Sequence, residues 1–453
     1  MNSVSKMRAG PRPARTFSKL GGVAAALVLA AAPLASLAAA PAAAQASSWN
    51  TDGAAIADFY RARGGRPLWL APQSGAAAQV MLGLLNGASV DGLNPNRYQA
   101  GKVAAAMRAA RNGDARAVNR AETLLSQAFI AYARDLRRAP NLGIVYVDRE
   151  LVPGPPMARA LLEQAAAAPQ FEAFVTRMEW MNPAYGQLRR ALTSRAYSSE
   201  LQRRTLALNL ERARALPAGN LRHVVVNAAA QRLFMYEDGQ IVDSMRVVVG
   251  KPKHATPMMN AFIRAAALNP YWNVPPDLAA ERIAPNVVKQ GVGYLKEQGY
   301  QLLSDWSDNP SIVDPGTIDW KAVADGRIEV RIRQLPGPQN ALGTMKFVFP
   351  NAQGIFLHDT PERQLLSEAS RLYSGGCIRL EDAPRLGRWM FGRDLKKQGS
   401  APEQIVRIET LVPLYITYMT AVPSGASIAY FDDVYGRDAA RLAALGGGNL
   451  VSR

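Results

Sequence analysis

The sequence predicts an α+β protein whose N-terminal half is helical and whose C-terminal half is rich in strands. Alanine, leucine and arginine dominate from Asp52 to about Arg222, and apolar residues recur there with the period of a helix. From His223 onward the apolar period changes to two, which is typical of strands. We therefore expect a helical scaffold domain over 47–222 and a β-rich domain over 223–440.

The first 46 residues predict an export signal. Five basic residues precede an apolar run from about Leu20 to Leu37, and small residues follow as far as Ala46. That order is typical of a secretory signal, so we expect cleavage after Ala46. The alternative is an uncleaved signal that anchors the chain in the inner membrane, because the run is just long enough to span a bilayer. Pro33 and the weakly apolar alanines disfavour that alternative.

The chain is strongly basic, with a formal net charge of +17. Five of these charges lie in the predicted signal, which leaves the exported part near +12. Nucleic acid is one partner for such a charge, but export disfavours it. We expect no nucleic-acid partner and a weak attraction to anionic surfaces of the cell envelope.

Individual elements follow from local patterns. In the helical half, Leu125, Phe129 and Tyr132 share one face, and Pro153-Gly-Pro-Pro156 marks a loop. Asp238-Gly239 predicts a hairpin turn between two strands. Further strands are expected over 224–227, 232–236, 241–249, 327–333, 345–349, 355–358, 412–418 and 427–431.

A Pro- and Trp-rich stretch separates the two groups of strands, from about residue 270 to 325. It is long for a plain connection, so we interpret it as an insert that covers a cleft. We expect few ladder partners for it and more motion than in the strands. The last residues, 441–453, contain Gly446-Gly-Gly448 and are expected to form a flexible tail.

Cys377 is the single cysteine of the chain, so an intramolecular disulfide is excluded. Gly375 and Gly376 precede it and leave bare backbone beside the sulfur. Such a site suits a substrate or an anion, although a free cysteine also packs as an inert small hydrophobe. We interpret Cys377 as a nucleophile.

A thiol nucleophile needs a base, and the chain has three histidines. His358 ends an apolar strand, and we expect a helix to return the chain from there to Cys377. The two side chains would then support thiolate–imidazolium chemistry, although a histidine at a strand end is often structural. His223 is interpreted as structural, and His254 as structural or near the substrate. One cysteine and one nearby histidine are too few ligands for zinc, so we expect no metal and no cofactor.

These residues resemble a known family. "IFLHDTP" and "YSGGCIRL", with the cysteine 19 residues after the histidine, are similar to the L,D-transpeptidase (YkuD-type) catalytic domain. The segments 206–214, 247–257, 269–275 and 431–438 resemble the large multidomain branch of that family. The resemblance implies a β-rich catalytic domain, a helical scaffold and a capping insert. It also implies periplasmic cross-linking of peptidoglycan stem peptides by acyl transfer, with inhibition by carbapenems and penems.

The resemblance also assigns roles. It implies that the backbone carbonyl of Asp359 orients the imidazole. Backbone N–H groups of Gly376 and Cys377 would hold the oxyanion. Arg379 would pair with a stem carboxylate or, equally, be a buried structural arginine. The other expected substrate contacts, whose aromatic members could equally be core, are Gly375, Phe356, Tyr271 and Trp272.

Two departures from the family pattern matter. Gly375 stands where the family usually has a histidine, so any role of that imidazole is missing. The scaffold also lacks room for the small peptidoglycan-binding insert of longer relatives, because Tyr185-Gly-Gln-Leu-Arg-Arg-Ala-Leu192 runs almost directly into the next helix. Substrate docking would then rest on the capping insert and the basic surface.

Three alternatives remain open. A secreted cysteine peptidase is disfavoured, because those enzymes place the cysteine before the histidine. The same acyl-enzyme could pass its acyl group to water, as an L,D-carboxypeptidase, or to a protein amine. A non-catalytic envelope-binding protein is disfavoured by the joint presence of histidine, glycine and cysteine.

Overall fold

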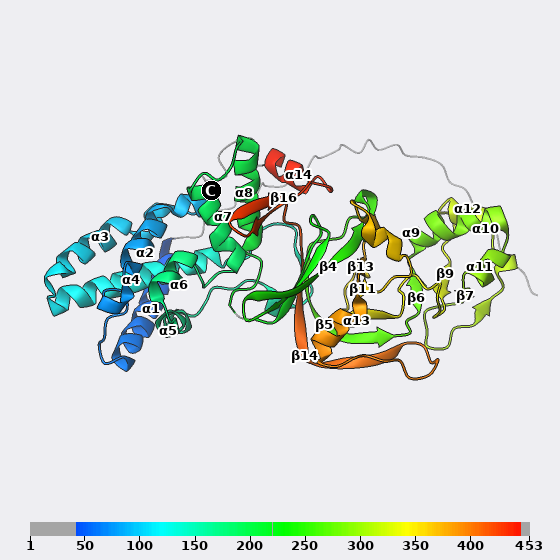
Figure 1. Cartoon of the computed structure of the whole chain (residues 1–453), viewed down its shortest axis with the longest axis horizontal. Helices are drawn as coiled ribbons and strands as arrows, with labels where there is room; N and C mark the ends of the chain where they lie inside the picture. The colour runs from blue at the N-terminus through cyan, green and yellow to red at the C-terminus, as the bar shows by residue number, and fades with distance from the viewer. Residues whose placement is uncertain (1–41, 220, 445–453) are drawn as a thin grey trace, which may run out of the picture. The chain divides into compact units, whose positions relative to one another are not determined.

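The structure is a computed structural model that describes residues 42–219 and 221–444 (Figure 1). Nearly all of the predicted signal, 1–46, lies outside the described residues, and so does Gly446-Gly-Gly448 of the predicted tail. From Trp49 onward the chain forms one compact unit, which is described here. Within the described residues, no helix combines the length and the apolar character that a membrane span requires.

The N-terminal half is helical, as predicted. Its helices begin at side chains that cap them: Asp114 accepts from the N–H of Ala117, and Asn182 accepts from the N–H of Ala184. Leu125 and Phe129, predicted to share a face, are both fully buried. The helices are α1 (Ala42–Ala62), α2 (Ala77–Asn86), α3 (Ala100–Ala109), α4 (Ala115–Leu136), α5 (Ala158–Ala167), α6 (Phe171–Arg177), α7 (Pro183–Thr193) and α8 (Glu200–Ala213).

Two buried carboxylates organise this helical core. Glu122, in the middle of α4, accepts hydrogen bonds from the backbone N–H groups of Leu68, Trp69 and Leu70, and one from the hydroxyl of Tyr60. Asp91 accepts from two tyrosine hydroxyls, at 2.6 and 2.7 Å, and from the guanidinium of Arg189 at 2.9 Å; the tyrosines are Tyr132 and Tyr185. Both charges are therefore well supplied with donors, which offsets the cost of burying them.

The C-terminal half is built on a ten-stranded sheet in the order β1-β5-β10-β11-β13-β4-β3-β2-β14, with β12 beside β4. Because β14 also pairs with β5, the path of strands closes on itself. The predicted turn at Asp238-Gly239 joins β3 to β4, with a left-handed backbone at both residues. The strands are β1 (Val145–Tyr146), β2 (His223–Asn227), β3 (Arg232–Glu237), β4 (Gln240–Gly250), β5 (Met259–Leu268), β10 (Met345–Val348), β11 (Leu357–His358), β12 (Leu372–Ser374), β13 (Ile378–Leu380) and β14 (Gln404–Thr417).

Three smaller elements complete this half. The hairpin β15 (Ala421–Ser424) and β16 (Ser427–Tyr430) follows β14, and α13 (Ala383–Phe391) begins at the predicted cap Asp382, whose side chain accepts from the N–H of Arg385 at 3.0 Å. The last helix, α14 (Arg437–Ala444), extends past residue 440, where we expected a flexible tail to begin.

The insert is a folded subdomain with its own sheet and core (Figure 1). The expectation of few ladder partners is wrong. The predicted strand 327–333 is β9, and it pairs with two strands of the insert instead of joining the main sheet, so the insert extends to Gln334. Ile332 is fully buried in the core of the insert, between the exposed Arg331 and the half-buried Arg333, which explains why this strand belongs to the insert. The elements are β6 (Trp272–Val274), α9 (Pro276–Leu278), a π turn over Ala279–Ile283, α10 (Ala284–Gln290), α11 (Gly293–Glu297), β7 (Tyr300–Leu303), β8 (Ile312–Val313), α12 (Trp320–Ala324) and β9 (Arg331–Gln334).

The expected helix between His358 and Cys377 is also wrong. Only a short 3₁₀ turn, Arg363–Ser367, stands there, and β12 follows it. The segment is tied to the sheet at both ends: the guanidinium of Arg363 pairs with Asp359 at 2.5 Å, and the N–H of Arg371 donates to the side chain of Gln231 at 2.5 Å. The bond to Gln231, 140 residues earlier in the chain, uses the N–H of Arg371 outside any helix.

Candidate active site

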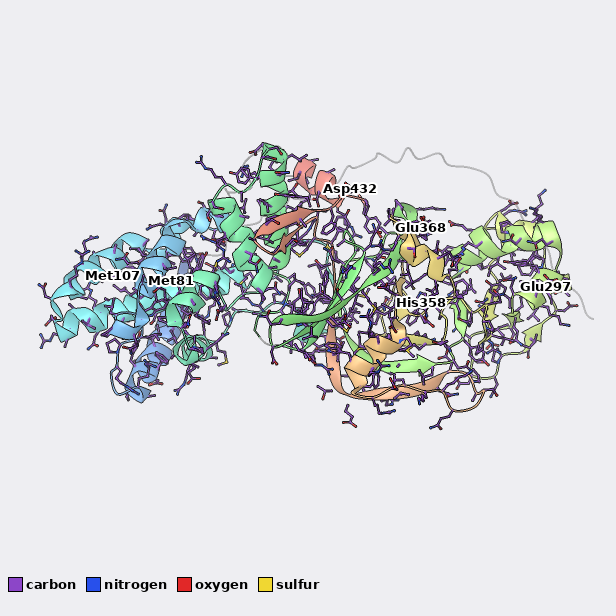
Figure 2. The ribbon with its side chains drawn as sticks, in the orientation of Figure 1. Met81, Met107, Glu297, His358, Glu368 and Asp432 are labelled. Atoms are coloured by element: carbon purple, nitrogen blue, oxygen red, sulfur yellow. The ribbon has the colours of Figure 1, made fainter. Side chains whose placement is uncertain are left out.

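His358 ends β11, and Cys377 immediately precedes the neighbouring parallel strand β13. Leu357 of β11 lies beside Ile378 of β13, and His358 lies beside Arg379. Leu357 and Ile378 are fully buried in the core of the sheet. In register, Cys377 stands two residues before Arg379, the partner of His358. Figure 2 labels His358 in its place among these strands.

His358 is held as a neutral base. Its side chain is buried, and Nδ1 lies 2.6 Å from the backbone carbonyl oxygen of Asp359. Burial, with Arg379 nearby, lowers the pKa of His358 to about 3. With Nδ1–H donating to Asp359, Nε2 is left with its lone pair. This is the tautomer that can take a proton from a thiol.

Cys377 is partly accessible, and its thiol lies 3.5 Å from the carbonyl oxygen of Gly354. Burial of the sulfur raises the pKa of the thiol, and a backbone hydrogen bond from Phe356 and the charge of Arg379 offset this only in part. A resting thiolate–imidazolium pair, which the sequence suggested, is therefore not the form that this structure favours. The structure instead favours a thiol and a neutral imidazole, and the hydrogen bond that the thiol donates goes to Gly354.

The loop before Cys377 is held by its own hydrogen bonds. Gly376 has φ +114°, a conformation that residues with a side chain rarely adopt. Its N–H, which we expected to hold the oxyanion, donates instead to the hydroxyl of Ser374 at 3.1 Å, and that hydroxyl donates to the carbonyl of Cys377. Among the described residues the N–H of Cys377 has no acceptor, so it is the donor left for an oxyanion.

A second set of residues, which the sequence did not single out, fixes the same loop. The hydroxyl of Thr256 donates to the carbonyl of Gly376 at 2.8 Å. Tyr435 donates to the carbonyl of Gly250 at 2.6 Å, and Arg437 donates to that of Thr256 at 2.8 Å. These residues come from the segments 247–257 and 431–438 that carried the family resemblance. The resemblance of these two segments to the family was the available signal; the sequence did not show that Thr256 bonds to Gly376 and Arg437 to Thr256.

Arg379 is already paired. Its side chain is 6% exposed and forms an ion pair with Glu362. Of the two interpretations of this arginine, a substrate ligand or a locked structural residue, the geometry favours the second. It places a positive charge beside the imidazole and the thiol without needing a ligand.

The insert touches the cysteine loop at Gly375. A Cβ built on Gly375 would stand 2.8 Å from a methyl carbon of Leu278, in α9. The space that a histidine would need at this position is therefore occupied by the insert. Gly375 itself is exposed.

Charged residues also join the insert to the main domain. Glu281 lies 3.5 Å from Lys251 and 3.1 Å from Nε2 of His254, and it pairs with Lys253 as well. Asp277 lies 3.6 Å from Nδ1 of the same histidine. His254 therefore lies between two carboxylates of the insert.

The three predicted aromatic contacts do not form one wall. Phe356 lies beneath the ammonium of Lys346, with 5.4 Å from nitrogen to ring centroid. Tyr271 is covered by the guanidinium of Arg333 at 4.4 Å. Trp272 packs against the core of the insert, near Tyr300.

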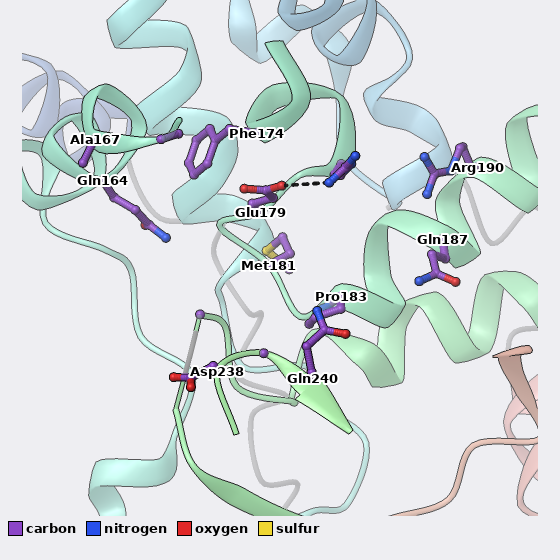
Figure 3. A pocket seen from close by; sticks show the side chains of 14 residues that line it. Gln164, Ala167, Phe174, Glu179, Met181, Pro183, Gln187, Arg190, Asp238 and Gln240 are labelled. Atoms are coloured by element: carbon purple, nitrogen blue, oxygen red, sulfur yellow. Dashed lines mark ion pairs between the residues drawn. The ribbon is translucent and has the colours of Figure 1, made fainter. Parts of the chain in front are cut away.

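Other features of the described residues lie apart from this site. No group of three or more histidines, cysteines or acids there is placed to hold a metal ion. A cavity of about 700 Å³ lies between α5–α7 and the β3–β4 turn, and its lining contains none of the predicted site residues (Figure 3).

Two family models match the chain. Residues 54–192 match the Scaffold domain, and residues 221–393 match the L,D-transpeptidase catalytic domain, which contains His358 and Cys377. The chain carries an L,D-transpeptidase catalytic domain. The predicted fold class and the family resemblance are thereby confirmed.

A Haemophilus influenzae protein described as "Putative L,D-transpeptidase" is 33% identical over 245 residues, 51% of this chain. The match spans 48% of that protein, so the chain covers about half the length of this curated relative. Two solved structures have lower sequence identity to this chain. An Ldtfm–avibactam carbamoyl enzyme is 13% identical over 43% of this chain and 48% of its own, with TM-score 0.21. An L,D-transpeptidase from Mycobacterium smegmatis is 15% identical over 44% and 59%, with TM-score 0.22. TM-scores this low add no support to the assignment, which rests on the family models.

Proposed function

We propose that this protein cross-links peptidoglycan stem peptides through a thioester on Cys377. The observation that supports the proposal is the pairing of β11, which ends at His358, with β13, which begins one residue after Cys377. The family of the catalytic domain supplies the reaction class, transfer of an acyl group from a stem peptide.

In the first half-reaction, His358 Nε2 takes the thiol proton as Cys377 Sγ bonds to the carbonyl carbon of the donor stem's third residue. The Cys377 N–H donates to the oxyanion, and one such donor is worth about 2.7–4 kcal/mol. The C–N bond to the terminal D-amino acid then breaks, and His358 returns the proton to its nitrogen. A thioester remains on Cys377.

In the second half-reaction, an amine of an acceptor stem attacks the thioester carbonyl and gives a proton to His358. The C–S bond breaks, and the thiol recovers that proton. Because the imidazole is neutral before each half-reaction, it acts as a base first and as an acid second.

The test uses the purified protein, a tetrapeptide stem and a carbapenem. We expect the wild type to form stem dimers and to gain the mass of one carbapenem, with the adduct on the single cysteine. Cys377→Ala should do neither. Dimers formed by Cys377→Ala, or no adduct on the wild type, would overturn the proposal. Monomers shortened by one residue would indicate that water is the acceptor instead.

We also propose export to the periplasm, on the strength of the basic and apolar N-terminal segment. A fusion of residues 1–60 to a reporter that is active only outside the cytoplasm should be active. Cleavage after Ala46, read by N-terminal sequencing, separates a periplasmic protein from one anchored in the inner membrane.

A further inference from the structure

The oxyanion donor of the proposed reaction belongs to the peptide bond between Gly376 and Cys377. The carbonyl of Gly376 accepts a hydrogen bond of 2.8 Å from the hydroxyl of Thr256, whereas the N–H of Cys377 has no acceptor among the described residues. In a trans peptide the C=O and the N–H lie in one plane and point in opposite directions. A bond that fixes the carbonyl therefore also fixes the direction of the N–H.

The hydroxyl of Thr256 has one possible acceptor for its proton. Thr256 is fully buried, and its hydroxyl oxygen accepts from the N–H of Gly250 at 2.9 Å. A hydroxyl carries a single proton and a carbonyl can only accept, so that proton goes to Gly376. Hydrogen bonds in such a chain polarise one another, which makes the N–H on the far side of the peptide a better donor.

Thr256 is itself held in place by the C-terminal part of the chain. A Cβ built on Gly250 would clash with the carbonyl oxygen of His254, so the chain folds back closely on itself between β4 and Thr256. Tyr435 donates to the carbonyl of Gly250 at 2.6 Å, and Arg437 donates to the carbonyl of Thr256 at 2.8 Å. Both residues follow residue 393, where the match to the catalytic-domain model ends.

Ser374 bonds to the neighbouring peptides instead. Its hydroxyl accepts from the N–H of Gly376 at 3.1 Å and donates to the carbonyl of Cys377. These groups belong to the peptides before and after the one that carries the donor. Among the described residues, Thr256 is therefore the one that bonds to the peptide between Gly376 and Cys377.

We propose that Thr256 is a positioning residue that fixes the oxyanion donor of Cys377, and that Tyr435 and Arg437 keep Thr256 in place. The inference rests on the proposed function, because the oxyanion forms only when Cys377 attacks a carbonyl. Loss of the Thr256 hydroxyl should therefore slow reactions that pass through an oxyanion and leave other reactions of the thiol unchanged.

The test compares two reactions of Cys377 in the full-length protein. Acylation by a carbapenem joins the sulfur to the β-lactam carbonyl through a tetrahedral oxyanion, and the C–N bond of the ring then breaks. Alkylation by iodoacetamide forms a C–S bond as the C–I bond breaks and iodide leaves, with no oxyanion. The thiol proton passes to His358 in both reactions. Each adds a defined mass to the single cysteine, so mass spectrometry of the intact protein gives both rates.

Thr256→Val keeps the size of the side chain and removes the hydroxyl. We expect it to slow acylation by about 10–100-fold, somewhat less than removal of an oxyanion donor would, and to leave the alkylation rate unchanged. Thr256→Ser keeps the hydroxyl and should restore acylation. The control is Ser126→Ala, which removes an equally buried hydroxyl bonded to Trp69 and Tyr60 in the scaffold. It should leave both rates unchanged.

Tyr435→Phe gives a second measurement that does not depend on the folding of Thr256→Val. It removes the hydroxyl that donates to Gly250 and should cause a smaller loss of acylation, again without loss of alkylation. Equal slowing of the two reactions in either variant, or normal acylation by Thr256→Val, would overturn the inference. Acylation of Thr256→Ser as slow as that of Thr256→Val would do the same.

Failure of the proposed function gives a different result. A wild type that is alkylated but not acylated would reject the proposed chemistry, and the inference with it. A wild type that is acylated normally, with variants that acylate at the same rate, would reject the positioning role of Thr256 alone.

Discussion

Buried charged and polar groups in the scaffold and in the catalytic half differ in how many hydrogen-bond partners they have. In the scaffold, Glu122 receives three backbone N–H groups and one hydroxyl, and Asp91 receives two hydroxyls and a guanidinium. In the catalytic half, His358 is buried with one ring nitrogen bonded, and Arg437 keeps an unsatisfied donor. Complete satisfaction rigidifies a core, whereas an unsatisfied buried group is costly unless a substrate completes it.

The largest effect is expected from removing the base. His358→Asn should slow carbapenem acylation of Cys377 by about 10²–10⁴-fold, because the thiol would lose its proton acceptor. His223→Asn is the matched control, since His223 is also buried and burial lowers its pKa as well. It should acylate at the wild-type rate. The rate of adduct formation is measured by mass spectrometry of the intact protein. Similar rates for wild type and His358→Asn would contradict the role of His358 as the base.

Removing a satisfied charge should affect stability alone. Glu122→Ala leaves the N–H groups of Leu68, Trp69 and Leu70 without an acceptor, at about 1–3 kcal/mol each when buried. We expect a loss of about 3–5 kcal/mol in the free energy of urea unfolding. Glu163→Ala removes an exposed pair with Arg159 and should cost less than about 1 kcal/mol. A loss below 1 kcal/mol for Glu122→Ala would show that this carboxylate contributes little to the stability of the helical core.

The lowered pKa of His358 predicts a pH dependence of stability. The folded state holds the pKa at about 3, whereas the unfolded chain titrates near 6.5, so between these values the unfolded state binds more protons. Stability should therefore fall as pH drops from about 6.5 towards 3, by about 1.4 kcal/mol per pH unit from this group. Urea unfolding of wild type and His358→Asn at several pH values isolates that slope. Parallel curves would contradict the assignment of a neutral, buried imidazole.

The smallest effect concerns the contact between the insert and the cysteine loop. In Gly375→Ala the new methyl would stand 2.8 Å from Leu278, so the flexible leucine must move. We expect the insert to dock less firmly by about 1 kcal/mol, seen as faster hydrogen exchange in α9. Adding Leu278→Ala should restore the exchange rate by making room. Exchange that is slower in Gly375→Ala than in wild type would indicate that the methyl fills a gap.

The sequence was sufficient where local pattern and chemistry agree. Period and capping predicted the two halves of the fold, and the spacing of His358 and Cys377 indicated the site that β11 and β13 bring together. The errors arose where tertiary contacts decide. Nothing local shows that Ile332 belongs to the core of the insert, or that Ser374 takes the N–H of Gly376.

The closure of the sheet by β14 completes the catalytic domain only near the end of the chain. β14 pairs with β2 and β5, both of which are synthesised about 140 or more residues earlier, and Arg437 follows it to hold the loop of Cys377. Chains grow from the N-terminus, and pairings so distant in sequence form late in folding. A ribosome that has released only β13 has already exposed the thiol, but not the frame that positions it. We therefore expect the proposed acyl transfer at Cys377 to become possible only when nearly the whole chain is free.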